Sequence, residues 1–271
     1  MSSLWLWAAA LFYSLGLAFA LLTVVQQRQT WFRLAMSGIG LGFLFHFVSL
    51  VERGITAGHF PVTNISEATS LFAFLITAGF LLAHRRYHMT SFTVFALPVV
   101  FVMTLAAAAS QHPSPTVAPI LKSGWVPLHV SATLVGYAAL LLACLAGVMY
   151  LIQERELKRK NPHAFYYRLP PLETIDRLGS QTLAIGFPFI TVGMSVGLLG
   201  AMASWEAGWV QDPKVAISAL LWVIYLLLIL SRVRAGWRGH KAALSAILGL
   251  AMALVSWGAN YLSTHHAFLG H

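Results

Sequence analysis

"LHVSATLVGYAALLLACLAGVMYLI", residues 128–152, contains no charged side chain and is long enough to cross a bilayer as a helix, which takes about 20 residues. Seven further apolar runs are spread along the chain. The eight lie near Leu4–Val25, Leu34–Val51, Glu67–Ala83, Phe92–Ala109, Leu128–Ile152, Gln181–Ala203, Val215–Leu230 and Ala242–Leu262. Backbone groups in lipid must bond within their own segment, and these runs do not alternate as barrel strands do. We therefore predict an all-α, polytopic integral membrane protein with eight transmembrane helices.

Composition agrees with this class. The chain has 58% hydrophobic and 9% charged residues, which excludes a soluble globular domain. We expect one transmembrane domain over residues 1–271. The first run lacks a basic leader and a small-residue cleavage site, so we interpret it as a retained helix. The single cysteine, Cys144, falls within the fifth run, which excludes an intrachain disulfide and favours a packing role.

The basic residues predict the orientation. Fourteen of the seventeen follow the first, third, fifth and seventh runs: Arg28, Arg33, Arg85, Arg86, Arg155, Lys158, Arg159, Lys160, Arg168, Arg177, Arg232, Arg234, Arg238 and Lys241. Cytoplasmic loops hold such an excess, so both termini should be extracytoplasmic. The net charge of +9 then faces anionic lipid head groups and is no evidence for nucleic acid binding.

Histidine and tryptophan gather on the predicted outer side. They are His59, His112, His129, His265, His266, His271, Trp125, Trp205 and Trp209. Each alone fits an ordinary interfacial residue. Together they suit haem, which takes imidazoles on opposite sides of its ring. His129 opens the fifth helix and His265 or His266 follows the eighth, so they could flank one ligand. A zinc site is less favoured, because it prefers three or four closely spaced ligands.

Several other residues have both a structural and a functional interpretation. His46 lies within the second run, where an ionisable side chain is a functional candidate or a neutral packing residue. Asn64 and Glu67 have the spacing of a capping box, and Asp212-Pro213 that of a helix start. Trp205 and Trp209 would form an aromatic shelf if their loop is helical.

These motifs resemble the cytochrome c assembly family of the CcsA, CcmC and HemX type. "WEAGWVQDPK", residues 205–214, is similar to the family's tryptophan-rich outer loop, and "WVPLHVSATLVGYAALL" to the segment that carries the first outer histidine, here His129. "WVIY", "GWRG" and "GHFPVTNISEATSLF" also match. "GANYLSTHHAF" resembles the end that carries the second histidine, placed at His266 with His265 as the alternative. The similarity extends from about Leu41 to the C-terminus.

The sequence also departs from this pattern. Gln211 replaces the last loop tryptophan, Val215 a glutamate, and Leu230 an intramembrane histidine associated with haem delivery. Together with the short length and "LPPLETIDRLG", these departures resemble the HemX/YpjD-like branch more than the full synthases.

The resemblance implies that haem b, transiently bound, is presented outside a bacterial plasma membrane to an apocytochrome c or to other cytochrome c assembly proteins. His129 and His266 would be axial ligands, Trp205 and Trp209 the shelf, Asp212 would order the loop, and Lys214 or Arg53 would meet the propionates. No residue is a candidate nucleophile or general base, so any synthase activity would rest on positioning. The alternative is a scaffold or regulator that binds a cytoplasmic partner through residues 153–177. A transporter ranks last, because the runs carry almost no ionisable residues near mid-membrane.

Overall fold

The computed structural model describes residues 2–110, 123–159, 169–205 and 209–263, and all regular secondary structure within them is helical. Eight of these helices are long and apolar enough to cross a membrane. They are α1 (Ser2–Gln26), α2 (Gln29–Ala57), α3 (Ile65–Tyr87), α4 (Phe92–Ala109), α5 (Trp125–Leu157), α6 (Leu172–Ser204), α7 (Pro213–Val233) and α8 (His240–Gly258). The predicted all-α membrane fold with eight spans is confirmed.

Several helices extend beyond the apolar runs that predicted them. α2 begins at Gln29 rather than near Leu34, and α6 begins at Leu172, directly after Pro171, rather than near Gln181. The added first turns of α6 carry polar residues, but they also bury Ile175 and Leu178. Packing of these two apolar side chains stabilises the turns as helix. α5 continues into the charged stretch as far as Leu157, and Lys158 Nζ lies 2.9 Å from Glu154 Oε1.

The chain forms two compact units. The first comprises Met1–Pro61, Ser66–Pro113 and Ile152–Thr174 and contains α1, α2 and α4 with nearly all of α3. Small residues let α1 and α2 approach closely, since a Cβ added to Gly38 would lie 3.2 Å from the backbone of Gly16. Phe43 of α2 stacks on Phe74 of α3 at a centroid distance of 4.5 Å.

The second unit comprises Val62–Ile65, Ser114–Leu151 and Ile175–His271. It contains most of α5 and α6, together with α7, α8 and two short 3₁₀ helices, η3 (Trp209–Gln211) and η4 (Ala259–Leu262). One apolar cluster links its four long helices: Leu140, Ala143, Leu183, Ile190, Leu221, Tyr225, Leu228, Ala246 and Ala253. Glycines again allow close packing, Gly136 against Ile190 and Gly147 against Ala243. The unit is a four-helix bundle with α5 in contact with both α6 and α8.

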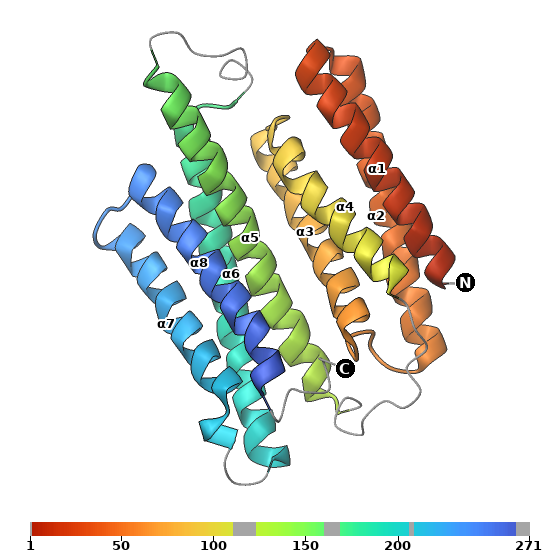
Figure 1. Cartoon of the computed structure of the whole chain (residues 1–271), viewed down its shortest axis with the longest axis vertical. Helices are drawn as coiled ribbons and strands as arrows, with labels where there is room; N and C mark the ends of the chain where they lie inside the picture. Colours follow the sequence, from red (N-terminus) through yellow and green to blue (C-terminus); the bar gives the residue numbers. More distant parts are fainter. Residues whose placement is uncertain (1, 111–122, 160–168, 206–208, 264–271) are drawn as a thin grey trace. The chain divides into compact units, whose positions relative to one another are not determined.

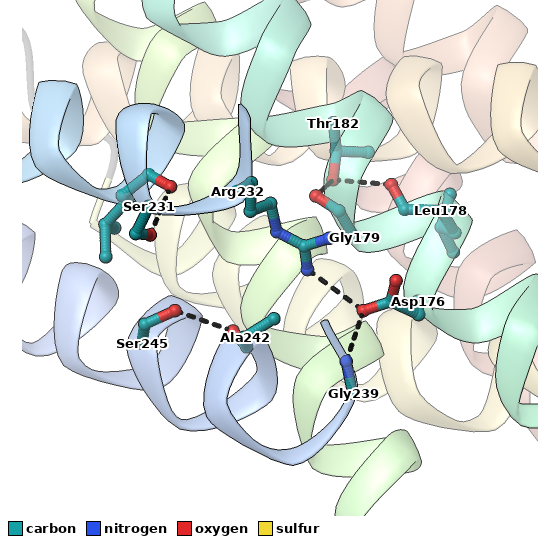
Figure 2. A network of polar contacts seen from close by, with 10 residues as sticks. Asp176, Leu178, Gly179, Thr182, Ser231, Arg232, Gly239, Ala242 and Ser245 are labelled. Atoms are coloured by element: carbon teal, nitrogen blue, oxygen red, sulfur yellow. Dashed lines mark hydrogen bonds and ion pairs between the residues drawn. The ribbon is translucent and has the colours of Figure 1, made fainter. Parts of the chain in front are cut away.

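A polar contact fixes one end of this bundle (Figure 2). Asp176 Oδ1 of α6 accepts a hydrogen bond from Arg232 Nη2 at 3.3 Å and another from the backbone N–H of Gly239 at 3.1 Å. Gly239 has a φ of 62°, a left-handed conformation that favours glycine in the turn between α7 and α8. One carboxylate therefore ties α6 to that turn.

The opposite end of the bundle collects the residues singled out from the sequence. There α5 begins, α6 ends, α7 begins and α8 ends, at the lower end of this unit in Figure 1. Hydrogen bonds at these ends join α5 to α6 and α7 to α8, and the contact of Tyr137 of α5 with Ser256 of α8 links the two pairs. We call this region the His129 end and define it as residues 125–133, 193–205, 209–218 and 256–263.

Candidate functional site

His129 lies in the second turn of α5, half-buried against α6. Its Nδ1 is 2.7 Å from the carbonyl oxygen of Gly193. Because a carbonyl can only accept, Nδ1 is the protonated nitrogen and Nε2 keeps its lone pair. A backbone bond of this kind fixes the tautomer and ring orientation of histidines that bind metals through the other nitrogen. Nε2 has no hydrogen-bond partner among the described residues.

A row of glycines on α6 makes room for this ring. A Cβ at Gly197 would overlap the His129 imidazole, and a Cβ at Gly200 would overlap the Trp125 indole. The same would happen between Gly193 and Thr133. Trp125 and His129 therefore pack closely against the glycine backbone of α6, with ring centroids 6.2 Å apart and ring planes tilted by 59°. Sequence reasoning missed this surface, although Gly193 and Gly197 have the GxxxG spacing of close helix packing.

Asp212 has the predicted role of helix cap. The Asp212 backbone is extended, and its side-chain Oδ1 accepts a hydrogen bond from the backbone N–H of Lys214 at 2.8 Å. Pro213 occupies the first helical position of α7. Its second carboxylate oxygen accepts from Ser263 Oγ at 2.7 Å. Asp212 and Ser263 are both buried. Asp212 thus joins the start of α7 to the chain that leaves η4, a link that the local sequence pattern did not reveal.

Lys214 points toward α8. Its Nζ donates to the backbone oxygen of Ser256 at 2.5 Å and lies 3.3 Å from the Ser256 hydroxyl. That hydroxyl also meets Ser218 Oγ at 3.2 Å and Tyr137 OH at 3.3 Å. The four residues form a polar cluster, defined as Tyr137, Lys214, Ser218 and Ser256, that connects α5, α7 and α8. An ammonium has three donors, so an N–H of Lys214 is left for a further acceptor.

The two loop tryptophans do not share one helix, because Trp205 follows the end of α6 and Trp209 begins η3. α6 ends at Ser204, the N–H of Trp205 bonds to Ala201 O at 2.9 Å, and a separate 3₁₀ turn begins at Trp209. Residues 206–208 lie outside the described residues. The shared helical face that would make a shelf is therefore not supported by the helix bounds. Each indole is half-buried at the His129 end.

The second expected ligand, His266 or His265, lies outside the described residues. The chain is described up to Ser263, which sits at the His129 end through its bond to Asp212.

His46 and Arg53 belong to the first unit. The His46 imidazole is fully buried, with Nε2 3.0 Å from Ser70 Oγ and Nδ1 3.5 Å from Tyr13 OH. Both ring nitrogens have a partner, which favours the packing interpretation over the functional one. Arg53 Nε donates to Glu67 Oε1 at 2.8 Å, so the glutamate at the third position of α3 joins that helix to α2. Asn64 directly precedes α3, as the capping-box spacing predicts.

The chemistry that the His129 end offers is ligand binding. It presents one imidazole with a free Nε2, aromatic rings and a partly satisfied ammonium. Among the described residues no group of three His, Cys, Asp or Glu side chains is placed to hold a metal ion by itself. Of the histidines expected to bind a ligand here, the described part of the site contains His129.

The fold and this site define a class, a polytopic helical membrane protein with a histidine-bearing bundle end. Residues 62–265 match the family model described as Cytochrome C assembly protein. The chain belongs to that family. The match includes the whole His129 end as well as His265.

Individual relatives agree with this assignment. The chain is 29% identical over 244 residues to the cytochrome c biogenesis protein CcsA of Prochlorococcus marinus subsp. pastoris, covering 81% of this chain and 77% of the relative. It is 30% identical over 260 residues to CcsA of Synechococcus sp. strain WH7803, covering 83% and 81%. With CcsA of Chlamydomonas reinhardtii it is 29% identical over 232 residues, covering 81% and 62%. The HemX/YpjD-like branch stays a prediction.

Proposed function

We propose that this protein binds haem b at the His129 end, on the extracytoplasmic face of a bacterial plasma membrane, and presents it to apocytochrome c during cytochrome c biogenesis. Membership of the cytochrome c assembly family and the names of the CcsA relatives support the process. The site itself supports the ligand.

The observation that carries the proposal is the hydrogen bond from His129 Nδ1 to the Gly193 carbonyl. It leaves Nε2 with its lone pair as the free ligand atom, and the overlap of a Cβ at Gly197 with the ring shows how tightly the ring is seated. A histidine that binds haem iron needs such a fixed tautomer, because the ligand atom must be deprotonated.

The second axial ligand is proposed to be His266, with His265 as the alternative. Tyr137 of α5 contacts Ser256 of α8 at 3.3 Å. From that contact His129 is eight residues along α5, about 12 Å of helix, and Ser263 is seven residues along α8 and η4, roughly 12 Å of helical chain. His129 and Ser263 therefore lie at a similar level of the same bundle end. His265 and His266 follow Ser263 in the sequence by two and three residues.

The other residues of the end have roles consistent with haem. Trp125, Trp205 and Trp209 supply aromatic surface, and the remaining N–H of Lys214 could donate to a propionate. Bound haem would supply a Lewis-acidic iron and vinyl groups for attachment to the cytochrome. The chain's own contribution is to bind and orient that group, since positioning can lower a barrier without acid–base catalysis.

The test is an absorption spectrum of the detergent-purified protein with a pyridine haemochrome assay. Wild type is expected to show a Soret band, which His129→Ala and His266→Ala shift or abolish. His265→Ala separates the two terminal candidates. His240→Ala, a histidine at the opposite end of the same bundle, is the matched control and should leave the spectrum unchanged.

A wild-type protein that is haem-free from haem-replete cells and binds none on titration with haemin would overturn the proposal. The scaffold alternative would then be the preferred hypothesis. It predicts that changes within residues 153–177 disrupt cytochrome c assembly, whereas His129→Ala does not.

A further inference from the structure

We infer that the turn between α7 and α8 binds the phosphate head group of an anionic membrane lipid. Residues 234–241, "RAGWRGHK", are called the basic turn. It carries Arg234, Arg238 and Lys241 and contains no acidic residue. The basic turn lies at the end of the second unit opposite the His129 end, so this lipid site is separate from the proposed haem site and does not depend on it.

Three cations of the basic turn are available for a ligand. Arg234, Arg238 and Lys241 are exposed, and their side chains have no hydrogen-bond or ion-pair partner among the described residues. Arg232, directly before the turn, differs from them because its side chain is largely buried and pairs with Asp176. Guanidinium and ammonium groups bind phosphate oxygens through charge-assisted hydrogen bonds. The exposed cations therefore fit a phosphate head group.

Hydrogen bonds hold the backbone of the basic turn in one conformation. The N–H of Trp237 donates to the carbonyl oxygen of Ser231 at 3.0 Å. The N–H of Gly239 donates to Asp176 Oδ1 at 3.1 Å (Figure 2). Gly236 and Gly239 have φ values of 63° and 62°, in the left-handed region that favours glycine. Because the backbone is already ordered, binding of a head group costs less conformational entropy than it would on a flexible loop.

Apolar surface next to the cations favours a lipid over a soluble anion. On α7 the exposed Leu227 precedes Arg234 by seven residues, which is two helical turns along the same face. On α8 the exposed Leu248 follows Lys241 by seven residues. Between the two helices the Trp237 indole is 40% exposed, and tryptophan is enriched where lipid meets water. A lipid with its phosphate on the cations and its acyl chains along these helix faces would contact both kinds of surface.

The test is native mass spectrometry of the full-length, detergent-purified protein. It is titrated with phosphatidylglycerol or with phosphatidylcholine of the same acyl chains, and wild type should bind the anionic lipid about tenfold more tightly or better. Arg238→Gln alone should weaken that binding about fivefold, the contribution of one cation near an anionic lipid surface. The triple variant Arg234→Gln, Arg238→Gln, Lys241→Gln should bind both lipids equally.

The matched control is the triple variant Arg28→Gln, Arg33→Gln, Arg85→Gln. It removes the same charge from three exposed residues of the first unit, which lie on the same predicted side of the membrane. This control should keep the preference of wild type for phosphatidylglycerol. An equal loss in both triple variants would show only a general attraction of positive charge to the lipid, and would overturn the site.

Two further outcomes would also overturn the inference. Inorganic phosphate that binds wild type as tightly as phosphatidylglycerol does would make the ligand a soluble anion. Equal binding of the two lipids by wild type would leave the basic turn free for an acidic protein partner instead. Thermal unfolding in the same detergent shows whether the triple variants fold, and Arg238→Gln keeps the test decisive if the basic-turn triple variant does not.

Discussion

Gly197 shows how one residue without a side chain can determine whether a ligand atom is presented. Its missing Cβ leaves the space that the His129 ring fills. The Cβ of Gly197→Ala would overlap the His129 ring, so the ring should move. Because the ring is also bonded to the Gly193 carbonyl, this movement should weaken that hydrogen bond. We expect the Soret band to weaken or shift while the protein still folds, measured by haemin titration and thermal unfolding in detergent.

The matched control is Gly40→Ala, since a Cβ at Gly40 meets nothing within 4 Å inside α2. It should leave haem binding unchanged and, if anything, raise stability by up to about 1 kcal/mol through the better helix propensity of alanine. Equal haem binding in wild type and Gly197→Ala would contradict the view that this close contact seats the ligand.

His46 is expected to stabilise the first unit rather than bind haem. Its buried ring contacts Ser70 and Tyr13, so His46→Ala removes core volume and leaves two polar groups without this partner. The free energy of unfolding should fall by roughly 2–5 kcal/mol with no change in the haem spectrum of the folded fraction. Chemical denaturation followed by tryptophan fluorescence measures the first effect. Loss of the Soret band in folded protein would instead make His46 part of the site.

Local pattern was enough to predict Asp212 as a cap, because the cap bonds to a backbone N–H two residues away. It could not predict the partners of Lys214 or Ser263, since Ser256 and Asp212 are distant along the chain and meet them only after the bundle forms. The tautomer of His129 was likewise invisible, because its acceptor belongs to another helix.

At the scale of elements, the contact of α6 with the α7–α8 turn depends on Asp176 (Figure 2). Arg232 is only 10% exposed in its side chain, and its Nε is buried without a partner among the described residues. Asp176→Ala would leave a buried guanidinium without its carboxylate and also release the Gly239 N–H. We expect a loss of about 3 kcal/mol in the free energy of unfolding.

Glu154→Ala is the comparison for this prediction. It removes another helix carboxylate, but one paired with a lysine whose side chain is 72% exposed, and such pairs contribute at most about 0.5 kcal/mol. Thermal unfolding of both variants in the same detergent measures the difference. Similar melting temperatures would mean that the Asp176 contact adds no more than a surface ion pair.

Hydrophobic runs predicted all eight long helices because lipid leaves the backbone little alternative to helix. They predicted the ends less well. Leu172 starts α6 before the apolar run, since its first turns bury residues on one face only. The four-residue spacing of the two tryptophans also did not predict that α6 ends at Ser204 and that η3 begins separately at Trp209.

At the scale of the whole molecule, the distribution of basic residues predicts that the His129 end is extracytoplasmic. The test uses a Cys144→Ala background, which removes the single native cysteine, and a membrane-impermeant maleimide applied to intact spheroplasts. Gln211→Cys in η3 and Thr56→Cys near the end of α2 should be labelled from outside. Arg238→Cys and Arg86→Cys should be labelled only after the membrane is opened; all four native residues are exposed. The reverse pattern would place the proposed haem site in the cytoplasm, where it could not meet an apocytochrome c outside.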